Sequence, residues 1–175
     1  LYCAALIALL IPSGLAAERQ QTKLCREHYM TNDPFEPFID LKDRTDIAEE
    51  FNIEPGWRFA LARRARFAEL DALGHLNHTT FLRYFEDVRI GYLMHHGLSA
   101  PGPDATGCVL ARLDASYQQP IFYDERLVIT VRTAKIGNTS MTLEYGAWSA
   151  KKGPACQSTS LLVMVQTKTG EKQSV

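Results

Sequence analysis

The chain has 175 residues, of which 46% are hydrophobic and 22% charged, which is typical of a globular protein with one domain and a single core. Its net charge of −1 provides no strong field for nucleic acid or an anionic membrane, so we expect neither as a partner. The four cysteines form no C-x-x-C pair and have no metal-finger spacing, which argues against a disulfide-stapled scaffold and favours reduced thiols in the cytoplasm.

The first 55 residues differ in pattern from the rest of the chain. Residues 1–17 are apolar and end in small residues like a signal peptide, but they lack a basic leader and are too short to span a membrane. We interpret residues 1–29 as a non-native extension or a signal-like segment; a genuine signal would make the protein exported. Residues 30–55 are acidic and contain several prolines, and we expect them to form an arm over the domain. Asp40 or Asp43 is the expected cap of one or two helical turns in this arm.

Residues 56–175 are predicted to form the folded domain, beginning with a strand over Trp57–Ala62. Residues 79–96 place their apolar side chains on one broad stripe, which predicts a helix about 27 Å long at roughly 1.5 Å per residue. Gly97 is a suitable left-handed end for this helix. The prolines and glycines between Leu98 and Gly107 predict a loop.

Four strand-like runs follow this loop, over residues 108–118, 126–136, 140–149 and 156–167. In the second run apolar and polar residues alternate, which indicates a sheet with one buried face. Gly137-Asn138 and Lys152-Gly153-Pro154 predict hairpin turns. The order of elements predicts an α+β fold, in which a curved antiparallel sheet buries the apolar stripe of the helix.

The segment between the first strand and the helix has the strongest chemical pattern in the chain. It reads Asp71-Ala72-Leu73-Gly74-His75-Leu76-Asn77-His78, with an acidic residue and a glycine just before the helix. The start of a helix offers unpaired backbone N–H groups and the positive end of the helix dipole. A carboxylate beside such donors can activate water or attack a carbonyl while the donors stabilise the oxyanion. We expect those donors between Asn77 and Thr80.

Each residue of this segment also has a simpler structural interpretation. Asp71 could act as a loop cap that accepts local N–H groups, and Asn77 as the N-cap of the helix. His75 is expected to hold the loop by hydrogen bonds. His75 and His78 beside Asp71 do not have a known zinc spacing, so we expect no metal. The chain contains neither G-x-G-x-x-G nor a P-loop, so we expect no nucleotide cofactor.

With the following Tyr84-Phe85-Glu86, the motif Asp71-x-x-Gly74-His75-x-Asn77 resembles the hotdog-fold acyl-CoA thioesterases of the 4-hydroxybenzoyl-CoA thioesterase type. The resemblance extends over residues 57–169. It implies a hotdog fold, with a curved antiparallel sheet wrapped around one long central helix. It also implies cleavage of acyl-CoA or acyl-carrier-protein thioesters without metal or cofactor, by homodimers that join sheets edge to edge and often stack into tetramers.

The resemblance also implies roles for individual residues. Asp71 would be catalytic, as general base or as nucleophile, and the substrate-binding residues would be Gly74, His75, Asn77, His78 and Thr79. His78 is a departure, because many relatives have a second asparagine at this position. The phosphates of CoA would lie near Lys135, Lys151 or Lys152.

Three alternatives to acyl-CoA hydrolysis remain open at this level. They are an acyl-carrier-protein thioesterase, a non-catalytic acyl-CoA-binding protein, and a hydratase built on the same fold. A binding protein has no need for a carboxylate beside the thioester, so Asp71 favours an enzyme. A hydratase would hydrate an enoyl-CoA without cleaving its thioester.

Overall fold

In a computed structural model, the described residues are 38–99, 106–150 and 152–175. The predicted extension 1–29, the first part of the arm and Lys151 therefore lie outside the described residues. The elements in chain order are β1 (Phe38–Asp40), α2 (Thr45–Glu50), β2 (Phe59–Arg64), the 3₁₀ turn η1 (Phe67–Glu69), α3 (His78–His95), β3 (Thr106–Tyr117), β4 (Arg126–Ile136), β5 (Ser140–Ser149) and β6 (Gly153–Gln166).

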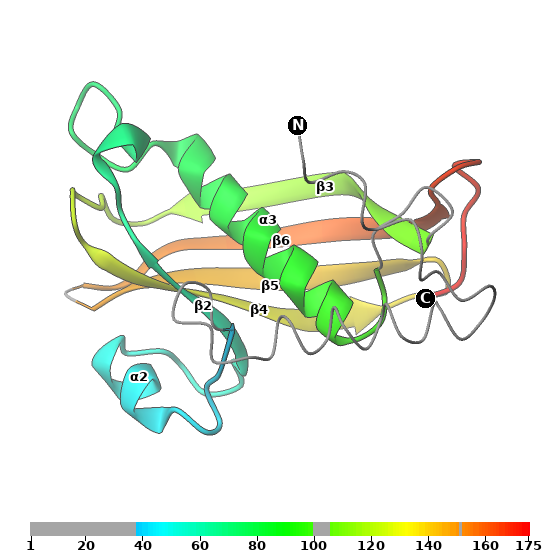
Figure 1. Cartoon of the computed structure of the whole chain (residues 1–175), viewed down its shortest axis with the longest axis horizontal. Coiled ribbons are helices and arrows are strands. Elements are labelled where there is room, and N and C mark those ends of the chain that lie inside the picture. Colours follow the sequence, from blue (N-terminus) through cyan, green and yellow to red (C-terminus); the bar gives the residue numbers. More distant parts are fainter. Residues whose placement is uncertain (1–37, 100–105, 151) are drawn as a thin grey trace, which may run out of the picture.

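The strands form one six-stranded sheet in the order β1-β2-β4-β5-β6-β3, and all neighbouring strands are antiparallel. Helix α3 crosses one face of this sheet diagonally, with η1 and the loop that follows it at its N-terminal end (Figure 1). The predicted α+β arrangement of an antiparallel sheet with a packed helix is therefore confirmed.

One face of the sheet is buried beneath α3, and the opposite face is buried only in part, since Thr159 and Leu161 of β6 are exposed on it. In β4, Leu127, Ile129 and Val131 belong to the core beneath α3, whereas Val128 packs on the opposite face with Trp148. Segment 38–57, which contains β1 and α2, packs on this part of the second face, beside β2 and β4. The expectation of a single buried face was therefore wrong, because the alternation in β4 does not reveal that the preceding segment covers the polar-looking side.

The predicted ends of helices and strands agree with the structure where a local capping or turn residue marks them. Asn77 is the N-cap of α3, and Gly97 follows its C-cap with a φ of +71°, as predicted. Strands β4 and β5 have the predicted bounds. In contrast, Arg44 and not an aspartate occupies the cap position of α2, and Gly153 and Pro154 lie within β6 instead of the turn.

The side chains beneath α3 form the larger core. Phe81, Phe85, Val88 and Leu93 from the predicted apolar stripe are buried against the sheet. Cys108 and Cys156 are both free thiols. No helix in the described part of the chain is long and apolar enough to cross a membrane.

Candidate active site

The loop that precedes α3 is a compact turn closed by its own backbone. An isolated β-bridge joins Leu70 to Leu76. Within it, the Asp71 N–H donates to the His75 carbonyl at 2.8 Å and the Gly74 N–H donates to the Asp71 carbonyl at 3.0 Å. Gly74 has a φ of +74°, and a Cβ at this position would have no heavy atom within 4 Å. Glycine is favoured here by the left-handed backbone conformation and not by lack of space.

The carboxylate of Asp71 uses one oxygen to hold this turn. Its Oδ1 accepts the N–H of Leu73 at 2.8 Å and the N–H of His75 at 3.2 Å. The second oxygen, Oδ2, receives no hydrogen bond from any described residue. The structural interpretation of Asp71 as a local cap therefore explains the position of Oδ1 only. The side chain is partly buried, and Oδ2 can still accept a hydrogen bond from another molecule.

At the start of α3, one backbone amide has no acceptor in the part of the chain that the structure describes. The Asn77 N–H donates to the Glu69 carbonyl at 2.9 Å, and the Thr80 N–H donates to the Asn77 carbonyl at 2.9 Å. Oδ1 of Asn77 accepts the Thr79 N–H at 2.9 Å and the Thr79 hydroxyl at 2.8 Å. Of the four amides expected as oxyanion donors, only the N–H of His78 has no acceptor among the described residues. Thr79 directs both of its polar groups to Asn77.

The two histidines of the motif pack against different aromatic residues. His75 is partly buried and lies edge-on to Phe122, with ring centroids 5.0 Å apart. His78 is exposed and lies edge-on to Tyr117 of β3, at 6.2 Å. The Tyr117 hydroxyl also donates to the backbone carbonyl of His78 at 3.4 Å. The motif residues thus gather at one end of α3, with Tyr117 and Phe122 as aromatic neighbours that the sequence did not single out.

Metal ligation was the other role considered for these histidines. In the described ranges, no group of three or more His, Cys, Asp or Glu side chains is placed to hold a metal ion. Asp71 and His75 are instead linked by two hydrogen bonds, one between their backbone groups and one from the His75 N–H to the Asp71 carboxylate.

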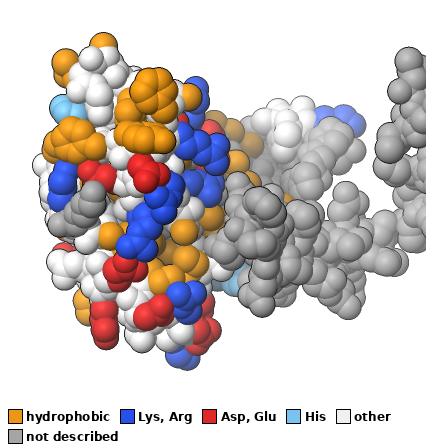
Figure 2. All heavy atoms as spheres, turned by 60° about the vertical axis from the view of Figure 1, so that its left-hand side comes forward, with side chains coloured by type: hydrophobic (Ala, Val, Ile, Leu, Met, Phe, Trp, Pro, Cys, Tyr) orange, Lys and Arg blue, Asp and Glu red, His pale blue; other side chains and the backbone are white. Residues whose placement is uncertain are grey.

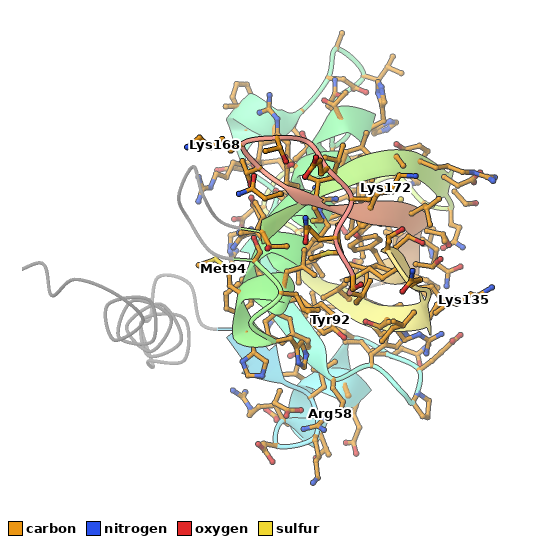
Figure 3. All side chains as sticks on the ribbon, turned by 90° about the vertical axis from the view of Figure 1, so that its right-hand side faces the viewer. Arg58, Tyr92, Met94, Lys135, Lys168 and Lys172 are labelled. Atoms are coloured by element: carbon orange, nitrogen blue, oxygen red, sulfur yellow. The ribbon has the colours of Figure 1, made fainter. Side chains whose placement is uncertain are left out.

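The basic residues expected near CoA phosphates are at different distances from this loop. Lys152 lies beside it, with Nζ 4.6 Å from the centre of the Phe122 ring, and donates to the Pro120 carbonyl at 2.9 Å. Figure 3 shows Lys135 together with Lys168 and Lys172 at the other end of the molecule, beyond the C-terminal half of α3.

A groove of about 570 Å³ near η1 is distinct from the motif. Its lining includes Glu69 and Tyr84 but none of the residues from 71 to 79. Figure 2 shows Lys and Arg side chains gathered at this end of the molecule among acidic ones. Most of these charges are paired, and the pairs that line the groove are Arg44–Asp46, Arg63–Asp87 and Arg126–Glu50. The groove therefore contains three ion pairs, together with Arg66 and with Arg64, which pairs with Asp124.

Comparison with known proteins places these observations in a family. The sequence model of the thioesterase-like superfamily matches residues 65–175, which include the loop, α3 and strands β3 to β6. The chain belongs to the thioesterase-like superfamily. The match supports thioester hydrolysis as the activity, whereas the narrower 4-hydroxybenzoyl-CoA thioesterase type stays a prediction.

Individual relatives and solved structures are also similar to this thioesterase-like chain. An uncharacterized protein of Bacillus subtilis (strain 168), YsmA, is 31% identical over 109 residues, which are 62% of this chain and 74% of the relative. A thioesterase superfamily protein from Jannaschia sp. CCS1 has a crystal structure that superposes with a TM-score of 0.67 at 30% identity, covering 73% of this chain and 81% of that one.

A thioesterase from Thermus thermophilus was crystallised with coenzyme A and zinc. Its structure superposes on this chain with a TM-score of 0.54 at 27% identity, covering 65% of this chain and 84% of that protein. The ligands describe that protein, and they identify coenzyme A as a molecule that a structural neighbour binds.

Proposed function

We propose that this protein hydrolyses acyl-CoA thioesters to the free acid and CoA, with Asp71 as the catalytic residue. The observation that carries the proposal is the pairing of polar groups at the N-terminal end of α3. Oδ2 of Asp71 and the N–H of His78 have no hydrogen-bond partner among the described residues, while the groups around them are paired. A carboxylate oxygen and an amide donor are the two groups that acyl transfer from a thioester requires.

In the proposed reaction, the thioester carbonyl oxygen accepts a hydrogen bond from the His78 N–H at the positive end of the α3 dipole. In one route, Oδ2 of Asp71 removes a proton from water, and the resulting hydroxide adds to the carbonyl carbon. In the other route, Oδ2 attacks that carbon itself and forms a mixed anhydride, which water then hydrolyses. In both routes the C–S bond breaks and CoA leaves as a thiolate, which needs little acid assistance because a thiol has a pKa near about 8.5.

The other motif residues have supporting roles in this proposal. Gly74 provides the left-handed turn, and Asn77 and Thr79 fix the amides around His78. His75 would shape the wall of the site with Phe122, and the side chain of His78 would do so with Tyr117. Of the lysines considered for a phosphate of CoA, Lys152 lies beside Phe122, where it also pairs with the Glu125 carboxylate at 3.6 Å.

The proposed active unit is a hotdog dimer in the cytoplasm, in which α3 is the long central helix of each subunit. Of the two edges of the sheet, β3 has 12 residues and β1 has three. A long strand with an unpaired edge is the natural site for pairing with a second copy. Tyr117, which contacts the start of α3, belongs to β3, so pairing through β3 would bring the partner subunit close to the motif. The pantetheine arm would then lie at the subunit interface.

The test compares the Asp71→Asn variant with the parent protein on a panel of acyl-CoA esters. The rate of hydrolysis is measured by the release of free thiol. Asparagine retains a side-chain oxygen that can accept the Leu73 and His75 amides, so the turn should persist while the base or nucleophile is lost. We expect kcat to fall by about 100-fold or more. Asp46→Asn is the matched control, since it removes one carboxylate from an exposed ion pair in α2.

Two results would contradict the proposal. If Asp71→Asn turned over the esters at the parental rate, Asp71 would not be the catalytic residue. If the parent protein released thiol from none of the esters, the proposed hydrolase activity would be refuted. If the protein cleaved acyl-carrier-protein thioesters faster than CoA esters, its substrate would be acyl-carrier protein and not acyl-CoA. The presence of coenzyme A in the Thermus thermophilus structure favours CoA.

A further inference from the structure

Glu69, the last residue of η1, contacts both the loop and α3 through two different groups. Its carboxylate oxygen Oε2 accepts the hydroxyl of Tyr84 at 2.7 Å and the backbone N–H of Arg66 at 2.8 Å. Its backbone carbonyl accepts the N–H of Asn77 at 2.9 Å and the hydroxyl of Thr80 at 3.5 Å. One residue thus joins η1, the N-cap of α3 and a position further along the helix.

These contacts lie at the base of the Asp71 loop. Glu69 immediately precedes the Leu70–Leu76 bridge and Asn77 immediately follows it, so their hydrogen bond joins the two ends of the loop. We call the stretch that follows Glu69 and the stretch that leads through Asn77 into α3 the two limbs of the loop. Tyr84 lies seven residues beyond Asn77, about 10 Å along the helix axis at 1.5 Å per residue. Its side chain belongs to the buried core beneath α3. The hydrogen bond from Tyr84 to Glu69 therefore ties the loop to the body of the helix and not only to its first turn.

The surroundings of this pair favour a persistent hydrogen bond. Burial and the nearby Glu69 carboxylate raise the pKa of Tyr84 far above its usual value, so the phenol stays protonated and acts as the donor. A hydrogen bond from a neutral hydroxyl to a carboxylate is shorter and stronger than one between neutral groups. The guanidinium of Arg63 lies 5.9 Å from the centre of the Tyr84 ring and adds a second contact that restrains it.

We infer that Glu69 and Tyr84 are positioning residues for thioester cleavage, because they fix the Asp71 carboxylate relative to the His78 amide. This inference rests on the proposed function. The two groups sit on opposite limbs of the loop, Asp71 after its start and His78 after its return, and both must reach the same carbonyl carbon and oxygen. A displacement of one relative to the other by about 1 Å would lower turnover by as much as about 100-fold. Neither Glu69 nor Tyr84 needs to touch the substrate to have this effect.

The test is Tyr84→Phe, which removes one hydroxyl group and keeps the buried ring. We expect kcat for thiol release to fall about tenfold or more, while KM changes less than about twofold. The matched control is Tyr145→Phe, which removes another buried tyrosine hydroxyl, one hydrogen-bonded to Ser160 at 2.8 Å. The control should lose thermal stability to a similar degree and keep the parental kcat.

Glu69→Ala provides a second variant, which leaves the buried Tyr84 ring unchanged and removes the oxygen that accepts its hydroxyl. We expect its kcat to fall as well, and the double variant Glu69→Ala/Tyr84→Phe to lose little more than the larger single loss, because both changes remove the same link. Parental kcat in both folded single variants would overturn the positioning role, and so would an equal loss of kcat in Tyr145→Phe. These results are independent of Asp71→Asn: a large loss in that variant would leave the proposed function in place even if the positioning role failed.

Discussion

Asp71 and Asn77 use their side-chain oxygens in the same way, on the two limbs of one loop. Each accepts two hydrogen bonds through Oδ1, Asp71 from two backbone amides and Asn77 from the amide and the hydroxyl of Thr79. For Asp71, the capping role and the proposed catalytic role are compatible because a carboxylate has two oxygens. Its cap orients the second oxygen, and orientation is a condition for its chemistry.

Asn77→Ala is predicted to lower the free energy of unfolding by about 1 kcal/mol, since it removes the acceptor for Thr79 at the start of α3. Urea denaturation followed by circular dichroism measures this change. Asn77→Asp is the control, because aspartate keeps the acceptor and adds a negative charge at the positive end of the helix dipole. Equal losses in the two variants would show that the side-chain oxygen does not stabilise the helix.

At the scale of elements, the sequence was informative where a signal is local. Asn77 and Gly97 mark the two ends of α3, and Gly137-Asn138 separates β4 from β5. Strand β1 was not predicted, because its three residues follow a proline-punctuated segment and its pairing with β2 joins residues about twenty positions apart. The turn before β6 was placed too late, because a bulge opposite Trp148 lets Gly153 and Pro154 pair within the sheet.

Gly91 marks the place where β1 packs against α3. A Cβ at this position would lie 1.9 Å from Cζ of Phe38 in β1. The Phe38 ring is also packed against Phe59, with ring centroids 4.8 Å apart, so it has little freedom to move aside. The glycine therefore fits a close approach between the helix and the edge strand, in spite of its low helix propensity.

Gly91→Ala is predicted to destabilise the protein by about 1–3 kcal/mol, because displacement of the Phe38 ring outweighs the gain in helix propensity. In a Phe38→Ala background the same substitution should stabilise by up to about 1 kcal/mol, since the obstacle is gone and propensity alone remains. Equilibrium unfolding of the four proteins of this cycle measures the coupling. The same sign of the effect in both backgrounds would refute the packing argument.

At the scale of the whole molecule, the candidate site combines local and distant parts. The motif from Asp71 to Thr79 is contiguous, so its placement at the start of a helix could be predicted from the sequence. Glu69 and Tyr84 could not be paired in this way, because 15 residues separate them and Tyr84 follows the apolar periodicity of a core residue. Tyr117 ends β3 and Phe122 lies in the connection to β4, about forty residues from the histidines, and only the folded chain brings them together.

The exposed edge of the sheet at β3 bears on how many copies of the chain form the site. Along β3 the side chains are mostly exposed, and Val109 and Leu110 are 53% and 42% exposed, although both are aliphatic. An exposed apolar stretch at the edge of a sheet invites pairing with another chain, and the exposed charges that β3 carries, Arg112 and Asp114, lie 3.7 Å from each other as an ion pair. We therefore expect the β3 edge to be covered in solution by β3 of a second copy, in line with the proposed dimer.

Val109→Glu/Leu110→Glu is predicted to convert the dimer to a monomer, because pairing through β3 would bring the four added carboxylates of two copies into one interface, where like charges are destabilising. Analytical ultracentrifugation measures the mass, and thiol release on the same samples should fall with the dimer fraction if the partner completes the site. Ile136→Glu is the control, since Ile136 is 65% exposed at the end of β4, away from the β3 edge, and this variant should keep both mass and activity. A parent protein that sediments as a monomer at assay concentration, yet cleaves thioesters at full rate, would refute the shared site.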